Sequence, residues 1–194
     1  MSYHAVLVAP PPSVPVNRAR PCYRLRVTSN GPALPFDPIA KAAQTWAERI
    51  GPNSAMQAVT NVMRVQQILQ AAVDESLRPH GLTFARYEAL VLLSFSRRGS
   101  LPMRLMGERL QLHPTSITNI VDRLEADGLA RRLPHPGDRR TTLVELTDAG
   151  RDRLKAATVA VTGAEFGLIG LEDDEVGTLS ALLTKVRRAA GDFA

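Results

Sequence analysis

The stretch HPTSITNIVDRLEADGLARRLPHPGDRRTTLVELT, residues 113–147, decides the fold of this chain. Apolar residues recur there every three or four positions, which predicts a helix over 114–128 with one buried face. That face consists of Ile117, Ile120, Val121 and Leu124. Gly128 is the natural end of this helix. Two short runs, 129–135 and 141–147, flank the turn HPGDRR and predict a two-stranded β-hairpin.

The segment before this stretch completes a helix–turn–helix. Residues 101–112 predict a short helix, and the break at His113-Pro114 separates it from the helix that follows. A helix–turn–helix followed at once by a β-hairpin is the arrangement of a winged helix. We therefore predict a mainly α chain (α+β) with a winged helix–turn–helix lobe over residues 81–147.

Further helices are predicted on both sides of the hairpin from apolar spacing and capping residues. They cover residues 38–50, 54–77 and 83–95, a segment from 148 to about 163, and a segment that opens at 171. Asp37 and Thr147 are the natural N-caps of the first and fourth of these helices. The helix at 83–95 is apolar nearly all round, so we expect it at the centre of the fold.

The charge of the 194-residue chain is unevenly distributed along its length. Residues 97–144 hold nine arginines against five acidic residues, whereas residues 37–96 are neutral. This asymmetry favours a polyanion as a partner, although an arginine-rich surface that only faces solvent would show the same pattern.

Residues 1–36 contain seven of the 14 prolines and four arginines, and we predict that this extension is disordered. No apolar run approaches the roughly 18 residues that a membrane-spanning helix needs. The first ten residues lack the basic start of a signal peptide, so a cytoplasmic location is expected.

The polar face of the helix at 114–128 has the side chains that read DNA bases. Its members are Thr115, Ser116, Thr118, Asn119 and Arg123. A recognition helix contacts base edges in the major groove with residues near its N-terminus. Asparagine suits adenine, arginine suits guanine, and a threonine methyl can meet the thymine methyl. Taken alone, the same residues would suit a solvated helix face.

The turn of the hairpin adds a second candidate contact with DNA. Arg139 and Arg140 lie at its tip, where exposed arginines can enter a minor groove or neutralise phosphates. Asp138 could orient one of the two guanidinium groups. A recognition-type helix directly followed by an arginine-tipped wing favours DNA binding over a polar turn of no function.

Residues 113–152 resemble the DNA-binding lobe of MarR-family transcriptional regulators. The resemblance rests on Asp122-Arg-Leu-Glu, Gly128-Leu, Asp138-Arg-Arg and Leu146-Thr-Asp-Ala-Gly, in that order. The sequence GLTFARYEALVLL at 81–93 also resembles the family's helix ahead of this lobe. The resemblance covers about residues 55–190.

The resemblance implies a homodimer that carries two winged lobes on a pseudo-palindromic operator of double-stranded DNA. Residues 37–80 and 148–191 would form the helical dimerisation region, and their helices are more apolar than one small lobe can bury. We expect a sequence-specific regulator, a repressor, which a small anionic or aromatic effector releases from DNA. The alternative is a winged-helix module that binds DNA without sequence preference or binds protein.

Some positions bear on particular roles within the family. Asp122 and Arg123 are expected to fix the recognition helix through ion pairs, and Arg123 could also read a base. The additional helix at 38–50, with Trp46, resembles the urate-responsive (PecS/HucR-like) branch, in which Glu88 would lie at the effector pocket. That branch has aspartate at the position of Glu88 and arginine at the position of Ile120, so urate itself is not carried over. For Trp46 itself, a core residue that braces the dimer is favoured over a contact with the effector.

Metal, redox and catalytic chemistry find little support in the sequence. None of the four histidines (His4, His80, His113 and His135) is paired at metal-ligand spacing, so neither a metal nor a cofactor is expected. Cys22 lies between arginines that favour its thiolate, but it is expected to be incidental rather than a redox sensor. No phosphate loop, nucleophile elbow or paired carboxylate motif indicates an enzyme.

Overall fold

The computed structural model describes residues 34–97 and 99–193, and all of their side chains except that of Arg139. Residues 1–33, with Cys22, lie outside the described residues, so what the sequence predicts for them stays a prediction. The described helices and strands are α1 (Pro38–Arg49), α2 (Ser54–Leu77), η1 (Arg78–His80), α3 (Phe84–Ser94), β1 (Ser100–Pro102), α4 (Met103–Leu110), α5 (Pro114–Ala126), β2 (Ala130–His135), β3 (Asp138–Leu146), α6 (Asp148–Gly163), η2 (Glu165–Gly167) and α7 (Asp173–Ala189).

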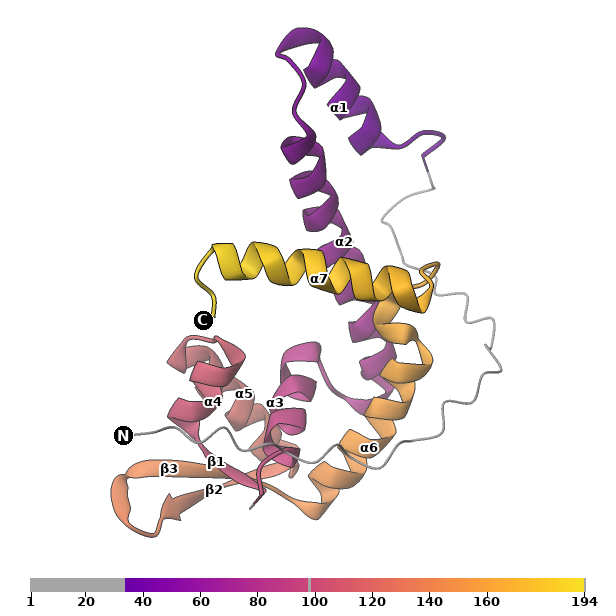
Figure 1. Cartoon of the computed structure of the whole chain (residues 1–194). Coiled ribbons are helices and arrows are strands. Elements are labelled where there is room, and N and C mark those ends of the chain that lie inside the picture. The colour runs from indigo at the N-terminus through magenta and orange to yellow at the C-terminus, as the bar shows by residue number, and fades with distance from the viewer. Residues whose placement is uncertain (1–33, 98, 194) are drawn as a thin grey trace.

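The first two helices form an arm that projects away from the rest of the molecule (Figure 1). Asp37 and Asn53 cap them, because each side chain accepts a hydrogen bond from a backbone N–H of the first turn. α1 packs against α2 and has no buried residue. α2 is buried only toward its end, at Ala72, Val73 and Leu77, where it meets α3 and α6.

α3 is the central helix, as its nearly all-round apolar sequence predicts. Its buried residues are Tyr87, Ala89, Leu90 and Leu93. It packs against α2, α4, α5 and α6 and also against the sheet. The Tyr87 hydroxyl lies 3.2 Å from the Thr158 hydroxyl on α6, so the one polar atom of this buried ring has a hydrogen-bond partner.

The predicted hairpin is present as β2 and β3, and β1 adds a third strand that the sequence does not predict, in an antiparallel sheet of the order β1-β3-β2. Ser100, Leu101 and Pro102 pair with β3, with Leu101 opposite Val144. Leu101 and Pro102 were expected to start the short helix, which instead begins at Met103. β1 has only three residues, too few for a pattern of its own to predict a strand, and it forms by pairing with β3.

The wing also differs in its boundaries from the sequence prediction. The turn HPGDRR is shorter than expected, because His135 and Asp138 already pair across the strands and leave Pro136 and Gly137 between them. Consequently, Arg139 and Arg140 belong to β3. α5 ends at Ala126, two residues earlier than predicted, and the left-handed Gly128 (φ 69°) then turns the chain toward β2.

α7 crosses α2 and buries none of its own residues (Figure 1). Its start is closed by a capping box of Glu172 and Glu175. Two of its large apolar side chains, Leu182 and Val186, are 58% and 68% exposed. Among the described helices, none is both long and apolar enough to cross a membrane.

Candidate nucleic-acid interface

α5 is anchored to the lobe by its apolar face. Ile117, Val121 and Leu124 are almost fully buried against α3, α4 and β2, as the sequence predicts. Ile120, the fourth residue of the predicted face, is only half-buried. This packing fixes which side of α5 is presented to a partner.

The opposite side of α5 carries the predicted recognition residues. Thr115, Ser116, Thr118, Asn119 and Arg123 are all exposed. The Thr118 hydroxyl donates to the carbonyl oxygen of Pro114 at 3.0 Å, so its methyl group is free to face outward. Arg123 forms no ion pair within the described residues, so its guanidinium is available for a base or a phosphate.

His113 caps the recognition helix, a role that the sequence analysis missed. Its Nδ1 accepts a hydrogen bond from the backbone N–H of Thr115 at 3.3 Å, directly before the proline that opens α5. The remaining N–H groups at the start of α5 and its helix dipole suit an anion such as a phosphate. The sequence offered one indication of this capping role, because His113 directly precedes the proline that opens α5.

A guanidinium clamp ties α5 to the wing. Arg132 on β2 forms ion pairs with Asp122, at 2.6 Å, and with Glu125, both on α5. The Arg132 backbone N–H also donates to Glu125 at 2.7 Å. Desolvation lowers the pKa of Arg132, but hydrogen bonds to the two carboxylates outweigh it and leave the pKa raised. Asp122 therefore fixes the helix as expected, whereas Arg123 does not share this role.

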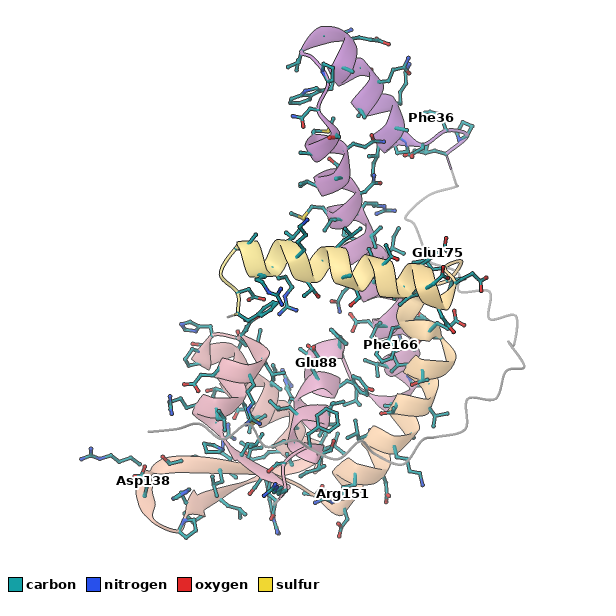
Figure 2. The ribbon with its side chains drawn as sticks, in the orientation of Figure 1. Phe36, Glu88, Asp138, Arg151, Phe166 and Glu175 are labelled. Atoms are coloured by element: carbon teal, nitrogen blue, oxygen red, sulfur yellow. The ribbon has the colours of Figure 1, made fainter. Side chains whose placement is uncertain are left out.

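Asp138 organises the tip of the wing (Figure 2). It was expected to orient a guanidinium group, but its contact with Arg140 is to the backbone N–H and not to the side chain. Its carboxylate accepts from the Thr141 hydroxyl at 2.7 Å and from the backbone N–H of Arg140 at 2.9 Å. These two hydrogen bonds hold the pKa of Asp138 below its ordinary value. The Arg140 side chain is exposed, while Arg139 is described only by its backbone in β3.

The junction behind the two reading elements is closely packed. Thr147 caps α6 by accepting from the Gly150 N–H at 3.0 Å, and its hydroxyl donates to the Gly128 carbonyl at 2.8 Å. Arg86 on α3 pairs with Asp127 at the end of α5 at 3.0 Å. The recognition helix is thus held along its apolar face by packing and toward its end by ion pairs.

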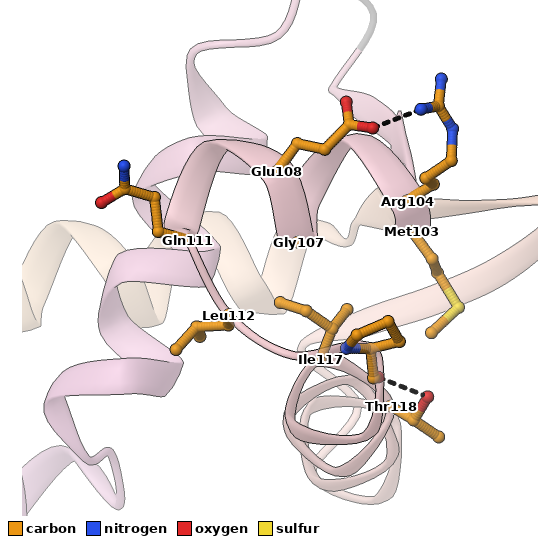
Figure 3. A pocket seen from close by; sticks show the side chains of 9 residues that line it. Met103, Arg104, Gly107, Glu108, Gln111, Leu112, Ile117 and Thr118 are labelled. Atoms are coloured by element: carbon orange, nitrogen blue, oxygen red, sulfur yellow. Dashed lines mark hydrogen bonds and ion pairs between the residues drawn. The ribbon is translucent and has the colours of Figure 1, made fainter. Parts of the chain in front are cut away.

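A hollow of about 600 Å³ lies between α4 and α5 (Figure 3). Ile117 and Thr118 contribute to one side and Met103 and Gly107 to the other. A side chain at Gly107 would crowd this turn, because a Cβ there would lie 3.3 Å from the Leu112 carbonyl oxygen and 3.5 Å from Ile117.

The two residues expected at an effector pocket lie on different parts of the chain. Trp46 lines a shallow groove on α1, in the projecting arm. Glu88 is half-buried on α3, in the body below α7 (Figure 2). Burial raises the pKa of Glu88 above its ordinary value of 4.5. A site that uses both would therefore need α1 of another chain.

A larger apolar hollow, of about 710 Å³, was not anticipated from the sequence. It lies between α2, η2 and α7, and its lining is apolar apart from three side-chain amides. Phe166 and Gly167, which both have left-handed backbone angles, form one wall. In the sequence, this hollow is indicated only by the glycines that interrupt the end of the α6 segment.

The geometry defines a winged helix–turn–helix lobe, a class of domain in which a helix and a hairpin face nucleic acid. The profile of the MarR family matches residues 80–141. The structure is similar to that of Sco5413, a MarR family transcriptional regulator from Streptomyces coelicolor, with 52% identity and a TM-score of 0.67. That likeness covers 72% of this chain and 96% of Sco5413. The chain belongs to the MarR family of transcriptional regulators.

Two other relatives support this assignment. A mutant of MarR from Escherichia coli, complexed with operator DNA, is 27% identical with a TM-score of 0.62, over 73% of this chain and 96% of MarR. The HTH-type transcriptional repressor MdtR of Bacillus subtilis is 36% identical over 84 residues, which are 43% of this chain. The match spans little more than half of MdtR, 53% of its length.

Proposed function

We propose that this protein is a homodimeric, sequence-specific DNA-binding regulator of transcription, a repressor whose affinity for its operator falls when a small molecule binds. The observation that carries the proposal is the row of exposed recognition residues on α5, whose apolar face is locked into the lobe. α5 would enter the major groove, and the wing with Arg140 would contact the adjacent minor groove or its phosphates. The relative MdtR is named a transcriptional repressor, which favours repression over activation.

The exposed apolar side chains outside the lobe support a second copy as partner. Val59, Val62 and Met63 on α2 are 48–62% exposed, and α7 presents its apolar residues without burying any. Exposed apolar side chains that cluster on helix faces in this way mark surfaces that another chain covers. A two-fold dimer would place the two copies of α5 about one turn of DNA apart.

The larger apolar hollow is the best-supported place for an effector. None of the described residues that line it is charged, and its volume of about 710 Å³ lies in the usual range for small-molecule sites. These properties favour an aromatic or otherwise apolar effector over a small carboxylate. Its walls come from helices assigned to the dimer and from Phe84 of α3, so occupancy could change how the lobes are spaced.

The test is fluorescence anisotropy with duplexes tiled across the upstream region of the gene, compared with a scrambled duplex at two salt concentrations. We expect one tile to bind tightly and to keep its preference at the higher salt concentration. Equal, salt-sensitive binding to every tile would leave phosphate contacts alone and would replace the proposal with a module without sequence preference.

Two substitutions should separate phosphate contact from base reading. Arg140→Ala should weaken binding to every duplex and reduce the salt slope by about 1, because one cationic contact is lost. Asn119→Ala should cost about 1–3 kcal/mol on the operator only and relax the preference at one base pair. Anisotropy on the operator, its single-base variants and scrambled DNA measures both effects. Wild-type behaviour of both variants would contradict the assigned interface.

Glu88 should make stability dependent on pH. Because burial raises its pKa, the folded state holds the proton to higher pH than the unfolded state does. The stabilisation that protonation gives is complete below about pH 4.5, the ordinary pKa of glutamate. It is lost as the pH rises through the raised pKa of the folded state. Glu88→Gln should therefore be more stable than wild type at pH 7 and similar at pH 4. Urea unfolding at both pH values measures the difference; an equal difference at both would contradict it.

A further inference from the structure

The chain folds back on itself directly after α7. Gly191 has a left-handed backbone (φ 74°), and its N–H donates to the Arg188 carbonyl at 3.0 Å. The Asp192 N–H donates to the Arg187 carbonyl at 3.1 Å. This reversal brings Phe193 under the last turn of α7, where the guanidinium carbons of Arg187 and Arg188 lie 5.3 and 5.4 Å from the centre of its ring.

Asp192 then connects two parts of the molecule that are distant in sequence. One carboxylate oxygen accepts from Arg187 Nε at 2.6 Å, and the other accepts from the Gln111 side-chain amide at 2.6 Å. These two hydrogen bonds hold the pKa of Asp192 below its ordinary value, so the carboxylate stays ionised near neutral pH. The contact with Gln111 spans 81 positions of the sequence.

Gln111 occupies the turn of the helix–turn–helix. It ends α4 with a left-handed backbone (φ 54°, ψ 41°), two residues before His113 caps α5. Gln111 also borders the hollow between α4 and α5 (Figure 3). A left-handed non-glycine residue carries a conformational cost, so glycine would serve the backbone better here.

The rest of α7 is loosely attached to its own chain. It buries no residue, and its Leu179 and Leu183 line the open apolar hollow that it shares with α2 and η2. The contact between Asp192 and Gln111 is therefore a specific tether from the end of the helix assigned to the dimer to the turn before the recognition helix.

We propose that Asp192 and Gln111 form a latch that positions the recognition helix relative to α7, and so sets the spacing of the half-sites that a dimer accepts. Both are positioning residues, because each acts on DNA through the placement of α5 rather than by contact. The part of this inference that concerns half-sites rests on the proposed function, whereas the restraint on the turn does not.

The first experiment is hydrogen exchange on the free full chain. Asp192→Ala should speed exchange of the backbone amides over residues 107–117, which lie far from it in sequence, by roughly 3- to 10-fold, the range for one exposed charge-assisted hydrogen bond. Asp152→Ala is the matched control, because Asp152 is an exposed aspartate on α6 that pairs with no other residue in the described part of the chain. Unchanged exchange in Asp192→Ala would overturn the latch whether or not the protein binds DNA.

The second experiment compares operators whose half-sites are moved apart by one or two base pairs. Gln111→Gly keeps the net charge and suits the left-handed backbone, so it should fold as well as wild type. We expect both Gln111→Gly and Asp192→Ala to reduce the preference for the native spacing by roughly 3- to 10-fold, and the double variant to reduce it no further.

The outcomes separate the latch from other effects. A uniform loss of affinity at every spacing would indicate only weakened folding and would overturn the positioning role. Additive effects of the two substitutions would show that the residues act independently, which also overturns it. If wild type binds all duplexes equally, the proposed function fails, and hydrogen exchange still decides whether the latch restrains the turn.

Discussion

Gly150→Ala is expected to destabilise the winged lobe by about 3 kcal/mol or more, because overpacking against backbone cannot be relieved by a side-chain rotation. A Cβ at this position would lie 2.1 Å from the Leu129 carbonyl oxygen and 2.8 Å from a methyl carbon of Leu146. No real Cβ approaches an oxygen so closely, so the start of α6 or the chain after α5 would have to move.

The cost is large because the same few residues make several contacts. Thr147 caps α6 at Gly150 and donates to the Gly128 carbonyl, and its N–H donates to the Leu129 carbonyl at 3.2 Å. Separating α6 from the chain after α5 would strain all of these hydrogen bonds together. The pattern of Gly128-Leu and Leu146-Thr-Asp-Ala-Gly, on which the family resemblance partly rests, thus has a packing reason.

Gly163→Ala is the matched control, at the other end of α6. A Cβ there would have no neighbour within 4 Å, and alanine is favoured over glycine in helices by up to about 1 kcal/mol. We expect this variant to be as stable as wild type or slightly more stable. Thermal unfolding followed by circular dichroism measures both variants. Equal melting temperatures for Gly150→Ala and wild type would show that the junction is looser than described.

The sequence was most informative where local chemistry decides the structure. The spacing of Ile117, Val121 and Leu124 predicted the buried face of α5, and Asp37 and Thr147 were identified as helix caps from residue type alone. Each of these predictions depends on residues within one or two helical turns. The exposed positions of the recognition residues follow from the same periodicity.

What the sequence could not provide depends on contacts between distant segments. Thr83, the residue before α3, makes no capping hydrogen bond with its side chain, and the Phe84 N–H instead donates to Asp74 of α2 at 2.9 Å. β1 exists because β3 offers it an edge, and the role of Gln111 follows from a partner 81 positions away. No pattern within a short window encodes such pairings.

Val186→Glu is expected to convert the proposed dimer to monomer without unfolding the chain. The Val186 side chain is 68% exposed in the single chain, so a carboxylate there remains solvated in the monomer. In a two-fold dimer the substitution occurs twice, and each uncompensated buried charge costs about 3–5 kcal/mol. The dimer dissociation constant should rise by at least about 100-fold even if most of that cost is relieved by water.

Ala181→Glu adds the same charge to the same helix, at an exposed position on the side of α7 away from Val186. We expect this control to remain dimeric in light scattering after size-exclusion chromatography, and both variants to keep the helical circular dichroism of wild type. Operator affinity of Val186→Glu should fall toward that of one lobe on one half-site, because the second lobe is no longer tethered. If Val186→Glu stays dimeric, the interface lies on other helices. If it becomes a monomer and keeps full operator affinity, the two lobes do not read DNA together.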